Sequence, residues 1–175
     1  RLRKMPDRTT QPEPGKAMGF ATATSEESGN PADNAVDGDK STRWCASSGK
    51  SGEKITVDMG RPVDVKTVNI LWEKQSNHLF KLEGSGDGKR WATIEDKTSG
   101  QNDSKEDTVE NKTGKPRYFR ITVTGNNQSN WASIREITFK NDKGEIIRPQ
   151  AAAGASKTDH PSSPGFNDKN WRSLN

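Results

Sequence analysis

The chain has few of the residues on which disulfide-bonded and many metal-binding domains depend. It contains one cysteine and two histidines among its 175 residues. The single cysteine, Cys45, excludes an intrachain disulfide, and its place beside Trp44 indicates a small buried side chain rather than a reactive thiol. No apolar run approaches the roughly 18 residues of a membrane span, and the charged, proline-containing start lacks the apolar stretch of a signal peptide. The sequence therefore does not decide whether the protein works in a reducing or an oxidising compartment.

The sequence also lacks the patterns of common catalytic sites. It has no His-Glu-x-x-His pattern, no phosphate-binding glycine loop and no serine nucleophile elbow. Paired acids such as Glu106 and Asp107 occur in polar surroundings, and we interpret them as solvated surface. We therefore expect this fragment to have no enzymatic activity.

The net charge of +4 is unevenly distributed along the chain. Its basic excess comes from residues 1–20 and 150–175, whereas the residues between them carry equal numbers of acids and bases. A nucleic-acid-binding domain normally carries a basic patch. The neutral centre therefore argues against a nucleic-acid partner.

Apolar residues recur with a period of two through most of the chain. The alternating residues are Ile55, Val57 and Met59, then Val68, Ile70 and Trp72, then Phe80 and Leu82, then Phe119, Ile121 and Val123, and finally Ile137 and Phe139. Short alternating strands separated by Gly-, Asn- and Ser-rich loops predict an all-β fold, an antiparallel sandwich around one core. We expect residues 1–19 to be a linker or disordered arm, residues 20–149 to form the sandwich, and residues 150–175 to lead into another module.

Residues 34–44, with the sequence NAVDGDKSTRW, place hard oxygen ligands around a glycine turn. Asp37, Asp39 and Thr42 supply oxygen atoms, and Gly38 permits a tight bend, so the segment suits Ca²⁺. The same pattern is common in solvated turns, and taken alone it favours that interpretation.

Two later motifs change this balance, YFRITVT at residues 118–124 and WASIREITF at residues 131–139. Together with residues 34–44 they resemble the discoidin, or F5/8 type C, family and its bacterial branch, the family 32 carbohydrate-binding modules. Three intervening motifs also resemble the family: ITVDMG at residues 55–60, VNILW at residues 68–72 and KLEGSGDGKRW at residues 81–91. The resemblance covers roughly residues 20–149 and implies a jelly-roll β-sandwich.

The resemblance further implies a structural calcium site. The matching ligands are the Asn34 carbonyl, the Asp37 carboxylate, Asp39, the Thr42 hydroxyl and carbonyl, the Arg135 carbonyl and the Glu136 carboxylate. An inward Glu136 in this strand-like run would need a counter-charge, which a bound ion would supply. The alternative is a Glu136 that points to solvent. When bound, the ion would pin residues 34–44 to the last strand.

The resemblance also implies a carbohydrate site on loops at one end of the sandwich, here residues 73–79 and 125–133. Sugar sites combine an aromatic ring with polar side chains. We expect Trp131 to stack on a sugar, and His78, Asn77, Glu73, Asn126 and Asn130 to contact its hydroxyls. The alternatives are a Trp131 folded over the core and a solvent-exposed His78.

Two further expectations follow from the family motifs. Apart from Arg90, the region 85–105 has no match for the arginine that many galactose-binding members use. We expect Trp44, Trp72 and Trp91 to lie in the core.

The C-terminal segment PGFNDKNWRSLN, residues 164–175, has a different character. Phe166, Asp168, Trp171, Arg172 and Leu174 resemble the start of the N-terminal domain of family 2 glycoside hydrolases, which include β-galactosidases. The alternative is an ordinary linker. Since the chain starts without Met and stops inside this motif, we interpret it as a piece of a larger protein.

The sequence thus predicts a non-catalytic carbohydrate-binding module for a galactose-type or related glycan, monomeric as a fragment, in a secreted, periplasmic or cell-surface glycoside hydrolase. The first alternative is a structural spacer without glycan binding. A lipid- or protein-adhesion role would need exposed apolar loop tips, for which Leu79 and Phe80 are the candidates. A solvent-facing Trp131 beside His78 in a cleft would favour glycan binding, and a buried Trp131 would favour the spacer.

Overall fold

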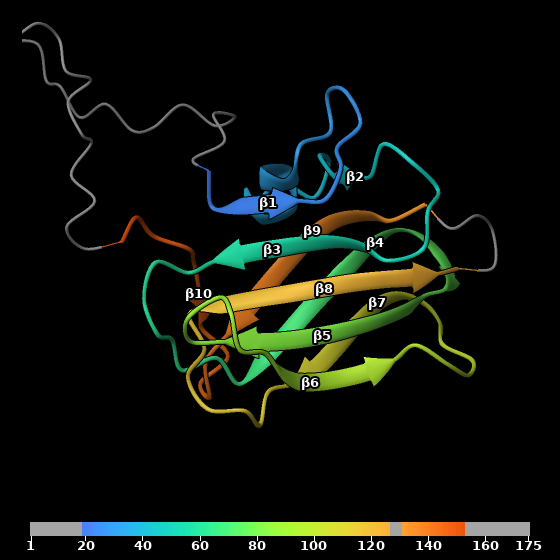
Figure 1. Ribbon diagram of the computed structural model, residues 1–175. Coiled ribbons are helices and arrows are strands. Elements are labelled where there is room, and N and C mark those ends of the chain that lie inside the picture. Colours follow the sequence, from blue (N-terminus) through green and yellow to red (C-terminus); the bar gives the residue numbers. More distant parts are fainter. Residues whose placement is uncertain (1–18, 127–130, 153–175) are drawn as a thin grey trace, which may run out of the picture.

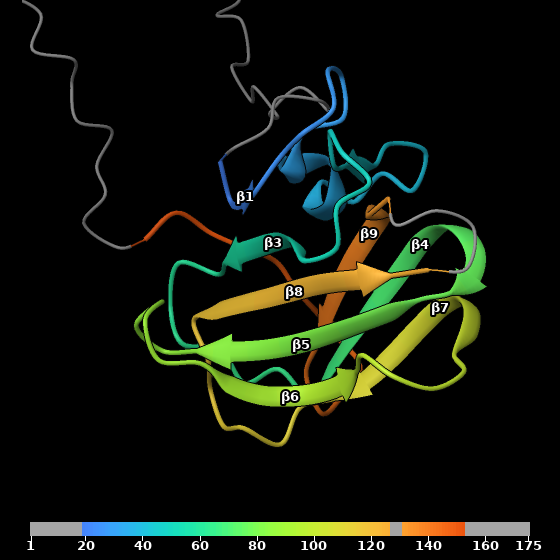
Figure 2. The ribbon, with the colours of Figure 1, turned by 45° about the vertical axis from the view of Figure 1, so that its right-hand side comes forward.

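The computed structural model describes residues 19–126 and 131–152, which form two antiparallel sheets packed face to face (Figure 1). The order of one sheet is β1-β3-β8-β5-β6 and that of the other is β10-β9-β4-β7, with β2 also paired to β9. Figure 2 shows β3, β8, β5 and β6 in one layer, crossed by β9, β4 and β7 in the other. The predicted all-β antiparallel jelly-roll sandwich is confirmed.

The elements follow in chain order. They are β1 (Ala21–Ala23), the 3-10 helix η1 (Ala32–Val36), β2 (Trp44–Cys45), β3 (Glu53–Asp58), β4 (Thr67–Asn77), β5 (Leu79–Ser85), β6 (Ala92–Lys97), β7 (Asp103–Glu110), β8 (Tyr118–Gly125), β9 (Ser133–Lys140) and β10 (Ile146–Ile147). In the part of the chain that these elements span, no helix could cross a bilayer.

The core lies between the sheets and contains every alternating residue predicted from the sequence. In β8, for example, Phe119, Ile121 and Val123 are buried, while the residues between them are half-buried. Because successive side chains of a strand point to opposite faces, the period of two selects one face of each strand for the core. Cys45 is buried as expected, and burial raises the pKa of its thiol.

The placement of Trp91 in the core is wrong. Trp44 and Trp72 are fully buried, but Trp91 is only half-buried and lies under the Arg120 guanidinium, whose carbon is 3.9 Å from the ring centroid. Trp91 follows the turn after β5 and precedes β6, outside the alternating strands. Motif position therefore did not predict its burial.

Two other expectations are corrected. Phe80 is fully buried and Leu79 is half-buried, so neither forms the exposed apolar tip that an adhesion role requires. Residues 73–77, expected in a loop, continue β4, and only His78 separates β4 from β5. The pairing of β4 with β7 shifts register between Leu71 and Ser76, and this irregularity interrupts the apolar alternation.

Asp107 is also not a solvated surface acid. It lies in β7, is 4% exposed and accepts hydrogen bonds from the Trp72 indole, Lys97, Ser104 and Asn102. The strand has the sequence DSKEDTVE, in which polar residues dominate. Pairing with β4 holds this strand in the sheet, so its own hydrophobic pattern carried little information.

The segment that leaves the domain passes the end of β3 (Figure 1). Its residue Gln150 lies close to Gly60, which follows that strand. Gly60 has a φ of +78°, and the Gln150 amide donates a 3.3 Å hydrogen bond to the Met59 carbonyl. A Cβ atom at Gly60 would lie 1.9 Å from the Gln150 carbonyl oxygen. Gly60 thus lets the backbone of the exit segment lie against the sandwich.

Replacing Gly60 by Ala is therefore expected to detach this segment. Gly52→Ala is a matched control, because Gly52 has a φ of +89° and a Cβ atom there would meet no other atom within 4 Å. Both variants incur left-handed strain of about 1–2 kcal/mol, but only Gly60→Ala should speed proteolysis after residue 147 and lower the unfolding free energy by about 1 kcal/mol more. Equal behaviour of the two variants in urea unfolding and limited proteolysis would contradict this role.

Candidate functional site

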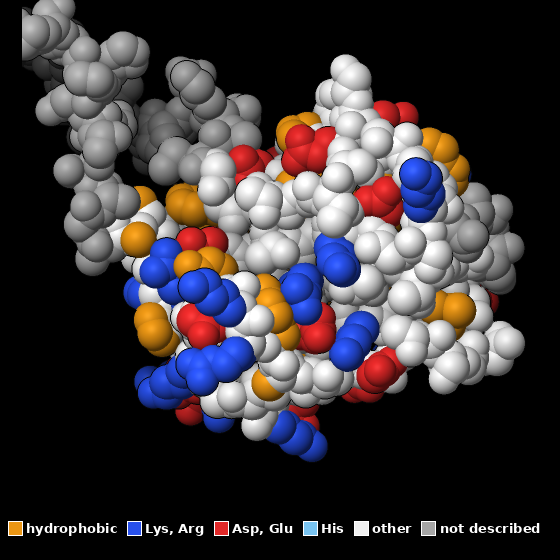
Figure 3. Space-filling model, viewed as in Figure 1, with side chains coloured by type: hydrophobic (Ala, Val, Ile, Leu, Met, Phe, Trp, Pro, Cys, Tyr) orange, Lys and Arg blue, Asp and Glu red, His pale blue; other side chains and the backbone are white. Residues whose placement is uncertain are grey.

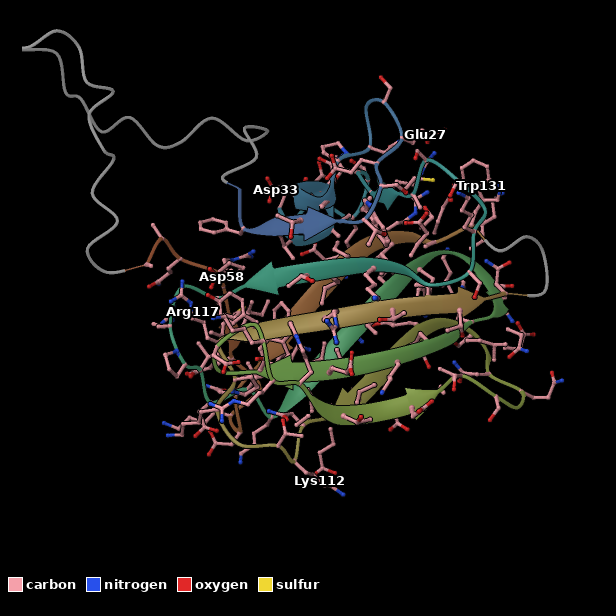
Figure 4. The ribbon with its side chains drawn as sticks, viewed as in Figure 1. Glu27, Asp33, Asp58, Lys112, Arg117 and Trp131 are labelled. Carbon is pink, nitrogen blue, oxygen red and sulfur yellow. The ribbon has the colours of Figure 1, made fainter. Side chains whose placement is uncertain are left out.

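A cavity of about 310 Å³ opens at the end of the sandwich where β4 passes to β5 and β8 approaches β9. Figure 4 shows Glu27 and Trp131 at this end. The lining residues are Glu27, Arg43, Cys45, Glu73, Lys74, Ser76, His78, Asn126, Trp131 and Ser133. The structure thus brings four of the predicted sugar-contacting residues together.

Trp131 is the exposed aromatic residue of this cavity. Its side chain is 42% exposed, and its carbonyl oxygen accepts a 3.0 Å hydrogen bond from the Asn126 side-chain amide. The indole rests against Gly49, where a Cβ atom would lie 3.1 Å from Nε1. A supported and solvent-facing ring beside His78 is the arrangement that favours glycan binding over a spacer.

His78 forms part of the cavity wall and is not a solvent-exposed loop residue. It is 5% exposed, and its ring stacks on Trp72 with the centroids 4.1 Å apart and the planes at 8°. Its Nε2 lies 2.8 Å from the Lys74 carbonyl oxygen. Burial lowers the pKa of the imidazole, which favours the neutral form.

Arg43 is the cavity residue that sequence reasoning missed. Its guanidinium lies 3.7 Å from the Glu27 carboxylate and 3.7 Å from the Glu73 carboxylate. Its Nε is buried without a hydrogen-bond partner among the described residues. Trp44 faces the core, so the alternation of side chains along a strand directs Arg43 away from the core. This was the signal in the sequence from which Arg43 could have been found.

Arg90, the only arginine identified in the 85–105 region, is not part of this cavity. Its side chain is 93% exposed and pairs with Asp87 at 3.1 Å. Arg43 instead supplies the guanidinium of the site, from the segment predicted to bind calcium.

The remaining predicted sugar contacts are divided. Glu73 lines the cavity, whereas Asn77 does not, since its side chain bonds to the backbone of Gly100 and Asn102. Asn130 lies outside the described residues.

A second group of oxygens lies in the turn after η1. The Thr42 hydroxyl is 2.8 Å from the Asp37 carboxylate, 2.8 Å from the Asp39 carbonyl oxygen and 3.3 Å from the Asn34 carbonyl oxygen. A hydroxyl has only one proton to offer these three acceptors. The Thr42 amide also donates to the Asp39 carbonyl oxygen, at 3.2 Å. Four oxygens converge here, and a group so rich in oxygen suits a hard cation.

The Asp39 carboxylate points elsewhere and accepts bonds from the Ser41 amide and hydroxyl, which lower its pKa. The Arg135 side chain ties this turn to β9 by donating to the carbonyls of Lys40 and Ser41, each at 3.2 Å. Asp39 therefore contributes its carbonyl oxygen, and not its carboxylate, to the group.

Glu136 points inward from β9 and is 6% exposed. Its carboxylate accepts a 3.2 Å hydrogen bond from the Gly38 amide. Burial, with the negative charge of Asp37 as a further cause, raises the pKa of this carboxyl to about 7. The carboxylate thus lies at the turn in a setting that opposes its ionisation unless positive charge is supplied.

Side chains alone do not form this site. Among the described residues, no group of three or more His, Cys, Asp or Glu side chains could hold a metal. Any cation here would depend on the backbone carbonyls and the Thr42 hydroxyl. Mixed oxygen ligands of this kind are usual for calcium, and the residues present therefore fit the ion.

A family model described as the F5/8 type C domain matches residues 20–137. The chain belongs to the F5/8 type C domain family. A search of functionally curated proteins gave no match.

Solved structures of family 32 carbohydrate-binding modules are similar to this F5/8 type C domain. The module of AlyQ, in complex with 4,5-unsaturated mannuronic acid, is 30% identical over 68% of this chain and 92% of that chain, with a TM-score of 0.58. A module from Clostridium perfringens, in complex with GlcNAc-α-1,4-galactose, is 26% identical over 67% of this chain and 85% of that one, with a TM-score of 0.59. The fold of the domain is that of a carbohydrate-binding module.

Chitosan-binding module 1 from a chitosanase/glucanase of Paenibacillus sp. IK-5 is 25% identical over 69% of this chain and 93% of that chain, with a TM-score of 0.62. Similar modules also occur within a structure that contains an alginate lyase domain and within a family 89 glycoside hydrolase. Domains of this fold are therefore found beside both hydrolase and lyase domains.

Proposed function

We propose that this domain binds carbohydrate without cleaving it, through the cavity at Trp131. The observation that carries this proposal is the exposed indole at a 310 Å³ cavity that also contains the Arg43 guanidinium with its unpartnered Nε. An aromatic face suits the apolar side of a sugar ring, and fixed polar groups suit its hydroxyls. Tethering a parent enzyme in this way raises the local concentration of its substrate.

The charges of the cavity favour an uncharged sugar. Arg43 and Lys74 offset Glu27 and Glu73, so these four groups have no net formal charge. The carboxylates accept hydrogen bonds from sugar hydroxyls, and the Arg43 guanidinium donates to sugar oxygens. A galactose-type or related neutral glycan is consistent with this set.

We further propose a structural calcium site in the turn after η1. The residues that would hold the ion are Asn34, Asp37, Asp39 and Thr42 with Glu136 and the Arg135 carbonyl. When bound, calcium would supply the positive charge that the buried Glu136 carboxylate needs in order to ionise. Because Thr42 directly precedes Arg43, fixing this turn also fixes the cavity wall.

The parent protein is proposed to be a secreted, periplasmic or cell-surface glycoside hydrolase of family 2. Support for that family comes from Phe166, Asp168, Trp171, Arg172 and Leu174, which lie outside the described residues. The similar modules found beside hydrolase and lyase domains support a glycan-active parent in general.

Replacing Trp131 by Ala is expected to weaken binding of a neutral galactan oligosaccharide by about 30-fold or more, the size of an interface hot spot. Arg43→Met should weaken it by about tenfold because donors to the sugar are lost. Isothermal calorimetry in the presence of calcium measures both effects. The matched control is Trp91→Ala, which removes another partly exposed indole of the described residues, one that does not line this cavity.

The same titrations distinguish the spacer alternative. A folded wild-type domain that binds no glycan, in a screen of neutral and acidic polysaccharides, would support the spacer. Undiminished binding by folded Trp131→Ala would move the site away from this cavity.

A further inference from the structure

A second cavity, of about 270 Å³, lies at the opposite end of β5 and β8 from the first. Its lining residues are Gly84, Ser85, Gly86, Arg90, Trp91, Ala92, Thr113, Lys115 and Pro116. The first cavity is reached at the start of β5 and the end of β8, whereas this one is reached at the end of β5 and before β8. The length of β5, about 20 Å, separates the two ends.

Trp91 provides a fixed aromatic surface in this second cavity. The Arg120 guanidinium lies over the indole ring, and its nitrogens donate to the Glu83 carboxylate at 3.0 and 2.8 Å. The Lys81 ammonium lies 3.3 Å from the same carboxylate. Arg120 does not line the cavity, so the indole is held by the sheet on one side and contributes another part of its surface to the cavity.

The rim of this cavity is basic. The Arg90 and Lys115 side chains are 93% and 66% exposed. Figure 3 shows Lys and Arg side chains gathered over this end of the molecule, with hydrophobic side chains among them. In contrast to the first cavity, this one has no acidic side chain in its lining among the residues that the structure describes.

The acids nearby are already paired with bases. Asp87 pairs with Arg90 at 3.1 Å, and Asp64 lies 3.7 Å from Lys115 and 3.8 Å from Lys66. Asp58 accepts two hydrogen bonds from Arg117, which lower its pKa. Adding Lys89 and Arg61 on the adjoining loops leaves an excess of positive charge at this end.

We propose that this second cavity binds an acidic sugar residue, a uronate, independently of the neutral-glycan site. The sugar ring stacks on Trp91, and its carboxylate lies between Arg90 and Lys115. The space at Gly86 is open, because a Cβ atom there would meet no other atom within 4 Å. A domain with both sites would bind two different segments of a mixed or charged polysaccharide.

A sugar is favoured over a nucleic acid because, among the described residues, a single aromatic side chain lines this open cavity. Single-stranded nucleic acids are held along extended grooves with several stacking side chains. Here one indole lines the cavity, with Arg90 and Lys115 beside it.

The test follows the indole N–H signals of the full chain by NMR, in 50 mM NaCl. Trigalacturonate is expected to shift the Trp91 signal saturably, and Trp91→Ala to abolish binding at this end. Arg90→Gln with Lys115→Gln should weaken trigalacturonate binding by about tenfold or more. Raising NaCl to 300 mM should also weaken it, because the contacts are ionic.

The matched control is Lys54→Gln with Lys105→Gln, which removes the same charge from strands away from this cavity. It is expected to retain most of the affinity. The proposal is overturned if trigalacturonate leaves the Trp91 signal unchanged. It is also overturned if the control double variant loses as much affinity as the Arg90 and Lys115 variant. A single-stranded oligonucleotide that binds Trp91→Ala as well as it binds the wild type would likewise contradict the proposal. The neutral oligosaccharide should shift the Trp131 signal, so either site can fail without the other.

Discussion

Removing calcium is expected to lower the thermal midpoint of this domain by about 10 °C relative to protein in millimolar Ca²⁺. A ligand at 1,000 times its dissociation constant stabilises the folded state by about 4 kcal/mol. For a domain of this size, 1 kcal/mol shifts the midpoint by about 2–4 °C or somewhat more. The physical cause is the buried Glu136 carboxylate beside Asp37, which requires positive charge to ionise. Differential scanning calorimetry with Ca²⁺ and with a chelator measures the shift.

The pH dependence of the domain's stability should change when calcium is removed. Without the ion, the folded pKa of Glu136 is about 7, above the value of 4.5 for an unperturbed Glu. The folded state therefore binds more protons, and this stability, about 3 kcal/mol, is fully present below pH 4.5 and lost as the pH rises through 7. The contribution of His78 to stability depends on pH in the opposite direction. Because its pKa is lowered in the folded state, stability is lost as the pH falls below 6.5. Comparing wild type with Glu136→Gln in chelator isolates the Glu136 contribution.

Two neighbouring acids provide the control for the calcium site. Asp37→Asn removes the carboxylate that lies 2.8 Å from Thr42, whereas Asp39→Asn changes a side chain bound to Ser41. Asp37→Asn should lose most of the calcium-dependent stabilisation, and Asp39→Asn should keep it. A wild-type midpoint that is identical with Ca²⁺ and with chelator would refute the calcium site.

Replacing Asp107 by Asn is expected to destabilise the domain by about 2–3 kcal/mol, because the buried carboxylate loses its hydrogen bonds and its ion pair with the partly exposed Lys97. The Asp107 carboxylate is 4% exposed and accepts bonds from Trp72 at 2.7 Å and from Lys97 at 2.9 Å. The side-chain NH₂ group of an Asn here would face the N–H donors of Trp72 and Asn102. Lys97 would also lose its counter-charge. Urea unfolding measures the loss. The matched control is Glu106→Gln, the adjacent exposed acid, which should change stability by less than about 0.5 kcal/mol.

Replacing Asp107 by Asn should also affect the first cavity. Trp72 is the ring on which His78 stacks, and His78 forms the cavity wall. Loss of the Asp107 bond to the indole should therefore weaken neutral-glycan binding, although Asp107 does not line the cavity.

Burial opposes ionisation of Asp107, yet its hydrogen bonds lower the pKa, so its stabilising contribution is present above pH 3.8 and lost as the pH falls. Equal stability of the Asp107 and Glu106 variants would contradict this account.

Much of the fold could be predicted because burial on one face of a strand leaves a period of two in the sequence. The alternation at Phe119, Ile121 and Val123 located β8 correctly. The alternation failed for β7, an edge strand whose residues are mostly polar and whose place in the sheet depends on pairing with β4. It also failed for the end of β4, where the shift in register interrupts the pattern.

The candidate site was predictable in part, for a related reason. Trp131, His78 and Glu73 were identified from the resemblance, and the structure places them around one cavity. Arg43 was missed because its neighbours in sequence belong to the calcium turn, while its partners Glu27 and Glu73 come from other parts of the chain.

The sequence by itself determined the fold class, the alternating residues of the core and the oxygen-rich turn, since each depends on spacing within a short stretch of chain. Only the tertiary structure decided that Trp131 is exposed, that Asp107 is buried and that Trp91 lies outside the core. Burial of these side chains depends on which distant strands approach them. Such long-range contacts leave no period in the sequence, because their partners are separated by tens of residues along the chain.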